Sequence, residues 1–236
     1  MSMEKKRFWT NVAVRPADDG YEVTLDKRPI KTPAKAQLVL QHQALADAIA
    51  QEWSDVKDTI NPDTMPATRM ANSVIDKVMH NRAAVQSMLG DYGASDLICY
   101  RADGPEKLIS LQAQKWDPLI EWTKVHFGPL NVTAGVMPVD QPTKTVAALN
   151  SSLDELSDWQ LAAAHDLITI SGSLVIALAL LANQFDENTA WMLSRIDEEW
   201  QIAQWGEDDD AKQDAAKKHA DFLFAYKFFK MTSSSA

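Results

Sequence analysis

The sequence predicts an α+β protein, with a small β-rich N-terminal domain at residues 1–60 and a larger, mainly α-helical bundle domain at residues 61–236. Three observations predict this class. Apolar and polar residues alternate over short stretches only within residues 7–40, as in strands with one buried face. Farther along, apolar residues recur with helical spacing. The linker between the two parts contains Pro62 and Pro66, and we place the domain boundary there.

The N-terminal part is expected to contain extended segments and one helix. Residues 8–14 alternate loosely and residues 21–25 alternate cleanly, with an Asp-rich turn between them. The other expected elements are an extended piece at 27–33, a short strand at 38–40 and an amphipathic helix at about 43–56. Trp53 follows the apolar face of this helix. We therefore predict that Trp53 packs the two domains together or closes the N-terminal core.

The second part is expected to be mainly helical. The first periodic segment after the linker, residues 67–89, predicts one long helix. A second helix opens at Pro105 and is expected to be interrupted at Pro118. The remaining expected elements are a short apolar piece at 95–101, an extended segment at 130–142 and helices at 143–156, 159–183, about 193–205 and 211–230.

One stretch of this part, residues 167–182, is apolar for sixteen residues apart from Thr169, Ser171, Gly172 and Ser173. A transmembrane helix needs about 20 apolar residues, so we expect no stable membrane insertion. All-round hydrophobicity favours the central buried helix of the bundle. Leu174 is accordingly predicted to be a core residue.

Charge and cysteine usage narrow the class of function. The chain of 236 residues has a formal net charge of −10, and residues 186–214 alone hold ten acidic and two basic residues. This charge disfavours a nucleic-acid partner, which needs a basic surface. Cys99 is the only cysteine, which suits a reducing compartment, and its apolar neighbours predict a buried, inert thiol. Residues 1–6 do not resemble a targeting peptide, so we expect a bacterial cytoplasm, or the mitochondrial matrix if a presequence was removed.

The sequence contains no recognisable set of catalytic residues. Only 8 glycines are present, and none forms a phosphate-binding loop; the 5 histidines are scattered. The carboxylates of Asp197, Glu198, Glu199 and Asp208 could be proposed as a metal site, but the ExxH pairs that such helical sites use are absent. We therefore expect no metal, no cofactor and no catalysis, and a binding protein is favoured over an enzyme.

Residues 193–208 predict a helix with two apolar edges. The broad edge, formed by Met192, Leu193, Ile196, Trp200 and Ala203, is the expected core face. The opposite edge is either sandwiched in the bundle or free for a partner, and periodicity does not decide between these. Gly206 is expected to end the helix, and the acids that follow are expected to open the next one. The candidate partner-binding residues are Trp191, Arg195, Glu198, Glu199, Ile202, Trp205, Glu207 and Asp208.

Several motifs occur in an order that is shared with a known family: Arg7-Phe8-Trp9, residues 25–33, Glu52-Trp53, and residues 65–72, 96–103, 116–119 and 193–208. With them the chain resembles, from about residue 7 to 225, the chaperones that assemble the catalytic head of ATP synthase. It is most similar to the member that binds the α subunit. The resemblance implies a non-catalytic protein with a β-containing N-terminal domain and a helical C-terminal bundle. It also implies a client, the unassembled α subunit, which is shielded from aggregation until the β subunit takes its place.

Two other functions compete with this interpretation. The sequence leaves the oligomeric state open, and a monomer is favoured. One is an enzyme of unrecognised type with an acidic cleft around Arg195, Asp197, Glu198 and Glu199. The other is a peripheral membrane protein that uses residues 167–182. Recovery of the α subunit from native lysate would favour the chaperone. A cleft with strongly perturbed carboxylates would favour the enzyme, and flotation with liposomes the membrane protein.

Overall fold

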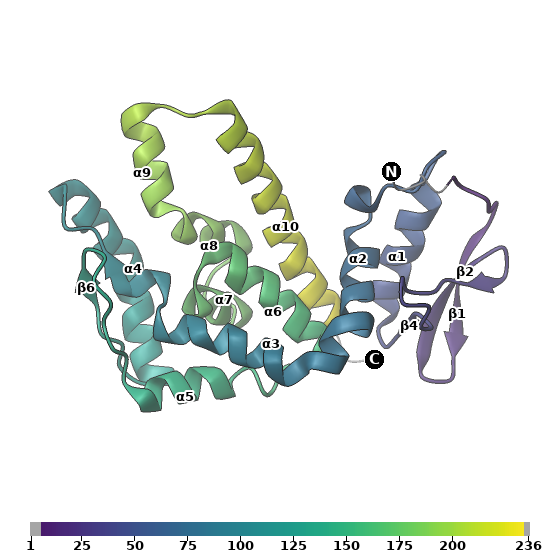
Figure 1. Cartoon of the computed structure of the whole chain (residues 1–236), viewed down its shortest axis with the longest axis horizontal. Helices are drawn as coiled ribbons and strands as arrows, with labels where there is room; N and C mark the ends of the chain where they lie inside the picture. The colour runs from purple at the N-terminus through teal and green to yellow at the C-terminus, as the bar shows by residue number, and fades with distance from the viewer. Residues whose placement is uncertain (1–5, 234–236) are drawn as a thin grey trace. The chain divides into compact units, whose positions relative to one another are not determined.

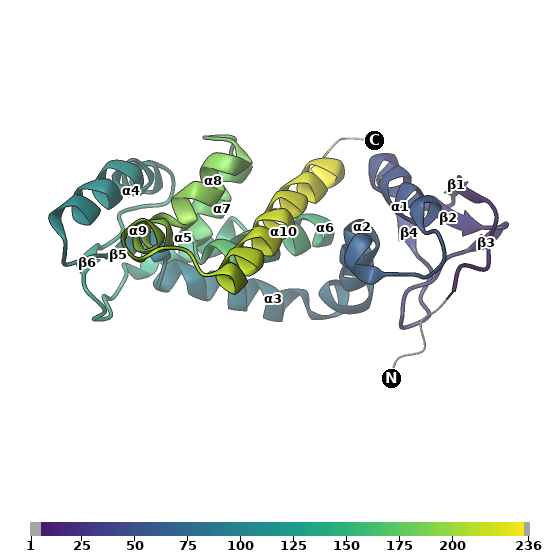
Figure 2. The ribbon, with the colours of Figure 1, turned by 90° about the horizontal axis from the view of Figure 1, so that it is seen from above.

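The computed structural model describes residues 6–233. It confirms the α+β class, because a small N-terminal sheet precedes a mainly helical remainder (Figures 1 and 2). The chain forms two compact units: the first combines the residues up to 82 with residues 157–163 and those from 227 onward, and the second contains residues 83–156 and 164–226. These compact units are not the two expected domains, and the predicted domain boundary after residue 60 stays a prediction. Residues 1–5, where no targeting peptide is expected, lie outside the described part.

The first unit is built on an antiparallel sheet. Strands β1 (Val12–Ala17) and β2 (Gly20–Leu25) pair from Val12 opposite Leu25 to Ala17 opposite Gly20. Strands β3 (Arg28–Pro29) and β4 (Val39–Leu40) both pair with β2. Pro16 is tolerated in β1 because this strand lies at the sheet edge.

The first strand begins at Val12, so the expected start at residue 8 is wrong. The carboxylate of Asp26 explains the difference, because it accepts hydrogen bonds from the backbone N–H groups of Thr10, at 3.1 Å, and Asn11, at 2.9 Å. These donors are therefore not available to a β ladder. The same bonds hold the pKa of Asp26 below its usual range.

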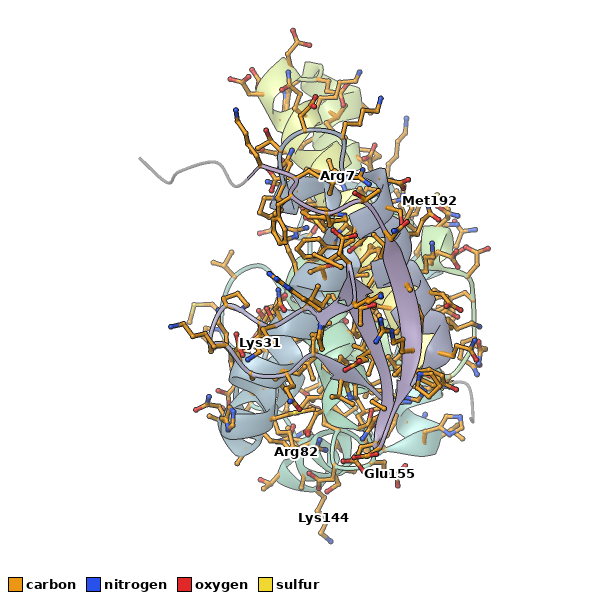
Figure 3. The ribbon with its side chains drawn as sticks, turned by 90° about the vertical axis from the view of Figure 1, so that its right-hand side faces the viewer. Arg7, Lys31, Arg82, Lys144, Glu155 and Met192 are labelled. Carbon is orange, nitrogen blue, oxygen red and sulfur yellow. The ribbon has the colours of Figure 1, made fainter. Side chains whose placement is uncertain are left out.

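Helix α1 (Gln43–Asp55) confirms the expected amphipathic helix and packs on the sheet, with Leu45 and Ile49 fully buried (Figure 1). Near its end, the rings of Trp53 and Trp9 meet edge to face with centroids 5.1 Å apart. Trp9 also donates its indole N–H to the carbonyl of Trp53 at 3.3 Å. The guanidinium carbon of Arg7 lies 5.5 Å from the Trp9 ring centroid (Figure 3). Trp53 thus closes the apolar layer between the N-terminal segment and α1.

Residues 67–89, expected as one helix, follow a helical path with two irregularities. Helix α2 (Pro66–Ser73) runs into a π-helical turn, η2 (Val74–Val78), and then into α3 (Met79–Asp91), where Asn81 has non-helical dihedral angles. The start of α2 is capped from α1 by Glu52, whose carboxylate accepts from the N–H groups of Ala67 and Thr68 at 2.6 and 2.8 Å. Burial raises the pKa of Glu52 although these bonds oppose the shift.

In the second unit, helix α4 (Glu106–His126) continues through Pro118, so the expected interruption is wrong. Pro118 is exposed, and a carbonyl that loses its partner there can bond to water. Strands β5 (Tyr100–Arg101) and β6 (Thr133–Ala134) form a short parallel pair. The shorter elements are the 3-10 turns η1 (Pro62–Thr64), η3 (Tyr92–Ala94) and η4 (Leu97–Cys99), and helix α5 (Thr143–Ser151).

The apolar stretch at 167–182 is buried as predicted, but it is two helices and not one. Helix α6 (Asp158–Ser171) ends before Gly172, which has a φ of 71°, and α7 (Leu174–Leu181) begins two residues later. The carboxylate of Asp96 accepts from the Val175 N–H at 2.9 Å and so caps α7. Leu174 is fully buried. Within residues 6–233, none of the helices combines the length and the apolar character that crossing a membrane would require.

Candidate functional site

The segment expected to bind a partner is not one helix. Helix α8 (Glu187–Ser194) ends at Arg195, whose φ of −118° and ψ of 15° are not helical, and α9 (Ile196–Trp205) starts directly after it. Figure 2 shows α9 nearly end-on while α8 is seen from the side. A helical face that is predicted with a constant turn of about 100° per residue therefore cannot continue through Arg195. Trp191 lies on α8, whereas Glu198, Ile202 and Trp205 lie on α9.

Two buried side chains of α4 contact the chain on either side of this break. The indole N–H of Trp116 donates to the carbonyl of Leu193 at 2.9 Å. The side-chain amide of Gln112 donates to the carboxylate of Asp197 at 2.6 Å, and its oxygen accepts from the Ala102 N–H at 2.8 Å. Trp116 is 0% exposed and Gln112 is 1% exposed. Helix α4 thus holds the end of α8 and the first turn of α9.

Trp191 is half-buried and packs against two aromatic residues of the second unit. Its ring stacks on His219 with centroids 4.9 Å apart and an interplanar angle of 18°, and Phe222 lies 5.9 Å away. On α8, Met192 (labelled in Figure 3) is 60% exposed, so its expected place in the core is wrong. The break at Arg195 explains both differences, because it turns α8 relative to the helix that the periodicity assumed.

Arg195 lies against the Trp191 ring, with its guanidinium carbon 5.2 Å from the ring centroid. Its nitrogens also approach the carboxylates of Glu198 and Glu199, at 4.0 and 3.6 Å. Both glutamates are on the exposed side of α9 and pair weakly at such distances. Arg195 is therefore held by its own helix junction and is not directed into an open cleft.

The outer face of α9 carries the remaining candidates. Glu198 and Glu199 are exposed, Ile202 is half-buried, and Trp205 is 80% exposed. Glu198, Ile202 and Trp205 follow the i, i+4, i+7 spacing of a single helical face. On another side of the helix, Trp200 lines an open groove of about 410 Å³ with Glu106, Lys107, Ser110, Leu111 and Gln114 of α4.

The corner after α9 follows the predicted pattern. Gly206, with a φ of 89°, ends the helix, and its N–H donates to the carbonyl of Ile202 at 2.8 Å. The Asp208 carboxylate accepts at 3.0 Å from two N–H groups in the first turn of α10 (Asp209–Ser233). Glu207 pairs with Lys212 at 2.8 Å and raises the pKa of this lysine. Asp208 therefore caps a helix, as the acidic run predicts.

The family model described as the ATP12 chaperone protein matches residues 6–124. A crystal structure of Atp12 from Paracoccus denitrificans is 45% identical, covers 96% of this chain and 98% of its own, and has a TM-score of 0.92. The chain belongs to the ATP12 chaperone family. The resemblance to the ATP synthase assembly chaperones, inferred from the motifs, is thereby confirmed.

Further ATP12 relatives come from bacteria and mitochondria. A variant of the Paracoccus denitrificans protein, with one aspartate replaced by lysine, is 44% identical with a TM-score of 0.92 and covers 96% of this chain and 97% of its own. The mitochondrial protein atp12 of Schizosaccharomyces pombe is 24% identical over 221 residues, which are 88% of this chain and 76% of that protein. These relatives are similar to the chain over most of its length.

The geometry of this ATP12-family chain gives the acidic-cleft alternative little support. Asp197 is bonded to Gln112, and Arg195 is occupied by its neighbours. Within residues 6–233, no three His, Cys, Asp or Glu residues are grouped as a metal site requires. Cys99 is buried, and burial raises the pKa of its thiol to about 12, so the thiolate that reacts is disfavoured.

Sequence reasoning missed Gln112 and Asp96, the two buried polar residues of the ATP12-family fold that matter most here. A signal for Gln112 existed, because it occupies a core position of α4 between Leu108 and Trp116 at spacings of four residues. A glutamine there requires polar partners inside the protein. Which partners these are cannot be deduced from the spacing.

Proposed function

We propose that this protein binds the unassembled α subunit of the F1 part of ATP synthase and prevents its aggregation until the β subunit replaces it. The observation that carries the proposal is the outer face of α9, where Trp205 is 80% exposed beside Ile202 and Glu198. An aromatic side chain left in water on a rigid helix is typical of binding hot spots. Membership of a chaperone family makes an unassembled protein the natural client.

The chemistry of the client explains why such a face is useful. A subunit that lacks its partner exposes apolar interfaces, and these promote aggregation. A protein that binds such an interface reversibly needs an exposed apolar surface and charged residues that steer the association. It needs no cofactor. Residues 186–214, with ten acidic and two basic residues, supply a negative field that would speed association with a basic or polar rim.

We further infer that the protein acts without catalysis and as a monomer. The family to which it belongs is described as a chaperone protein, which supports the first inference. The bacterial and mitochondrial origins of these relatives support a bacterial cytoplasm or a mitochondrial matrix as its location.

The test is a double variant, Glu198→Lys with Trp205→Ala, assayed by light scattering of isolated α subunit. Both side chains are exposed, so folding should be preserved, while binding should weaken by at least about 2 kcal/mol, the scale of a hot spot. The matched control is Glu155→Lys with Val136→Ala, which makes the same charge change and also truncates an exposed apolar residue, on other elements.

Three results would contradict the proposal. A double variant that protects the α subunit as well as wild type would place the binding surface elsewhere. A control variant that loses protection equally would show that the effect is not specific to α9. Recovery of the β subunit, and not the α subunit, by the tagged protein from lysate would refute the choice of client.

A further inference from the structure

The break between α8 and α9 is maintained by contacts from a distant helix. No glycine or proline occurs between residues 187 and 205, so the local sequence would allow a continuous helix. In such a helix, the carbonyl of Leu193 would accept from the N–H of residue 197. Here the indole N–H of Trp116 takes that carbonyl at 2.9 Å, and α9 starts with the Glu199 N–H bonded to the carbonyl of Arg195.

Gln112 makes the matching contact on the other side of the break. It lies one turn before Trp116 on α4, so both side chains point to the same side of that helix. Its oxygen is fixed by the Ala102 N–H at 2.8 Å, which leaves its amide nitrogen to donate to Asp197 at 2.6 Å. The amide therefore has one orientation, and it ties the first turn of α9 to α4.

The position of the outer face of α9 depends on this contact. Trp205 lies eight residues beyond Asp197, about 12 Å along a helix that rises 1.5 Å per residue. A tilt of about 20° at the junction would displace the far end by about 4 Å, by the same geometry. Such a displacement is larger than the tolerance of a close-packed interface.

We propose that Gln112 is a positioning residue for client binding: by holding Asp197 it sets the direction of α9 and with it the place of Glu198, Ile202 and Trp205. The inference rests on the proposed function, because it assumes that this face contacts the α subunit. Gln112 itself is buried and does not touch the client.

The disrupting variant is Gln112→Glu. It keeps the size of the side chain and the acceptor for Ala102, but it replaces the amide donor with a second carboxyl group at the 2.6 Å spacing of wild type. Such a pair keeps the contact while it shares one proton and repels once both groups are ionised. Exchange and binding are therefore compared at pH 6 and pH 9, and the loss of the contact is expected at pH 9. We expect hydrogen exchange of the amides in residues 196–205 to become at least about tenfold faster. We also expect the Kd for the isolated α subunit to rise at least about tenfold, with exchange in α1 unchanged.

The rescuing variant combines Gln112→Glu with Asp197→Asn. One oxygen of the new glutamate accepts from Ala102 and the other accepts from the new asparagine amide, so the hydrogen bond is restored with its donor and acceptor exchanged. A Kd that returns to within about threefold of wild type is expected. The readout that separates positioning from general stability is the exchange pattern, because a purely structural role predicts faster exchange throughout the second unit and not only in residues 196–205.

The outcomes separate the two proposals. If wild type does not bind the α subunit, the proposed function fails. If wild type binds and Gln112→Glu binds equally well, the positioning role is refuted, as it is if the double variant stays as weak as the single one. If Gln112→Glu does not fold, Asp197→Ala replaces it, since this change removes the acceptor without adding a charge. Wild-type affinity in Asp197→Ala would then overturn the inference.

Discussion

The hydroxyl of Ser173 donates a hydrogen bond of 2.6 Å to the carboxylate of Asp96, and both side chains are fully buried. The same hydroxyl oxygen accepts from the Ile176 N–H at 2.9 Å, while Asp96 also accepts from Val175. The start of α7 is therefore capped twice, once by its own serine and once by a carboxylate 77 residues earlier in the chain. Burial outweighs these bonds and raises the pKa of Asp96 to about 6.

This raised pKa predicts a stability that depends on pH. Because the folded-state pKa of about 6 lies above the ordinary value of 3.8, the contribution of Asp96 is fully present below pH 3.8 and is lost as the pH rises through about 6. The loss is about 3 kcal/mol at 1.36 kcal/mol per pKa unit. Asp96→Asn has no such titration. Urea unfolding of both proteins should be measured between pH 4 and 7. The difference between the free energies of unfolding of wild type and variant should change by most of this amount. A difference that stays constant with pH would refute the prediction.

Leu174→Ala should lower the free energy of unfolding by about 2–5 kcal/mol, because Leu174 is fully buried and truncation leaves a cavity. Met192→Ala is the matched comparison. Met192 is 60% exposed, so its truncation should change stability by no more than about 0.5 kcal/mol. Chemical denaturation measures both. An unchanged midpoint in Leu174→Ala, or a large loss in Met192→Ala, would contradict the described packing.

Trp53→Arg should destabilise the first unit by about 3 kcal/mol, since it removes a packed aromatic ring and brings a second guanidinium close to that of Arg7. Arg7 adds to the cost, because its guanidinium already lies by Trp9 and donates to the carbonyls of Ser54 and Val56. Trp53→Phe, which keeps a ring in place, should cost less. Thermal melts followed by circular dichroism and the soluble yield report the effect. Equal melting temperatures for Trp53→Arg and wild type would show that this ring pair is unimportant.

Gly172→Ala should cost about 1–2 kcal/mol, which is the penalty of a left-handed conformation for an L-residue. No atom lies within 4 Å of the position where a Cβ would be added, so the cost is in the backbone and not in a clash. Gly172→Asn should recover part of the loss, because asparagine adopts positive φ more readily. If the alanine and asparagine variants were both as stable as wild type, the φ of 71° at Gly172 would not be required for the break between α6 and α7.

Local signals in the sequence predicted the elements that such signals specify. The alternation of apolar and polar residues predicted β2, and an apolar stripe with helical spacing predicted α1. Gly206 and the acidic residues after it predicted the end of α9 and the start of α10. The break at Gly172 also had a signal, namely a glycine followed by Ser173, which is a favourable N-cap. The apolar residues on both sides of Gly172 do not reveal this break, because one buried helix and two consecutive buried helices have the same apolar composition.

The break at Arg195 had no local signal. Ser194, Arg195 and Ile196 are all compatible with a helix, and the groups that stabilise the break, Trp116 and Gln112, lie on α4. Helical periodicity is valid only within one helix, so Glu198, Ile202 and Trp205 kept their common face while Trp191 did not. Within α9 the expected core face is buried only at Ile196, since Trp200 is half-buried and Ala203 is exposed. The candidate binding surface therefore stays a prediction.

The first unit is made of three separate chain segments, and this arrangement limits the order in which the protein can fold during translation. Trp159 at the start of α6 stacks on Phe228 near the end of α10, with centroids 6.3 Å apart, and both residues belong to the same unit as the N-terminal sheet. At about 5–20 residues per second, the ribosome needs roughly 7–30 s to pass from residue 82 to residue 227. During that interval the segment up to residue 82 lacks the other segments of its unit, so the part of the chain that is synthesised first is finished last.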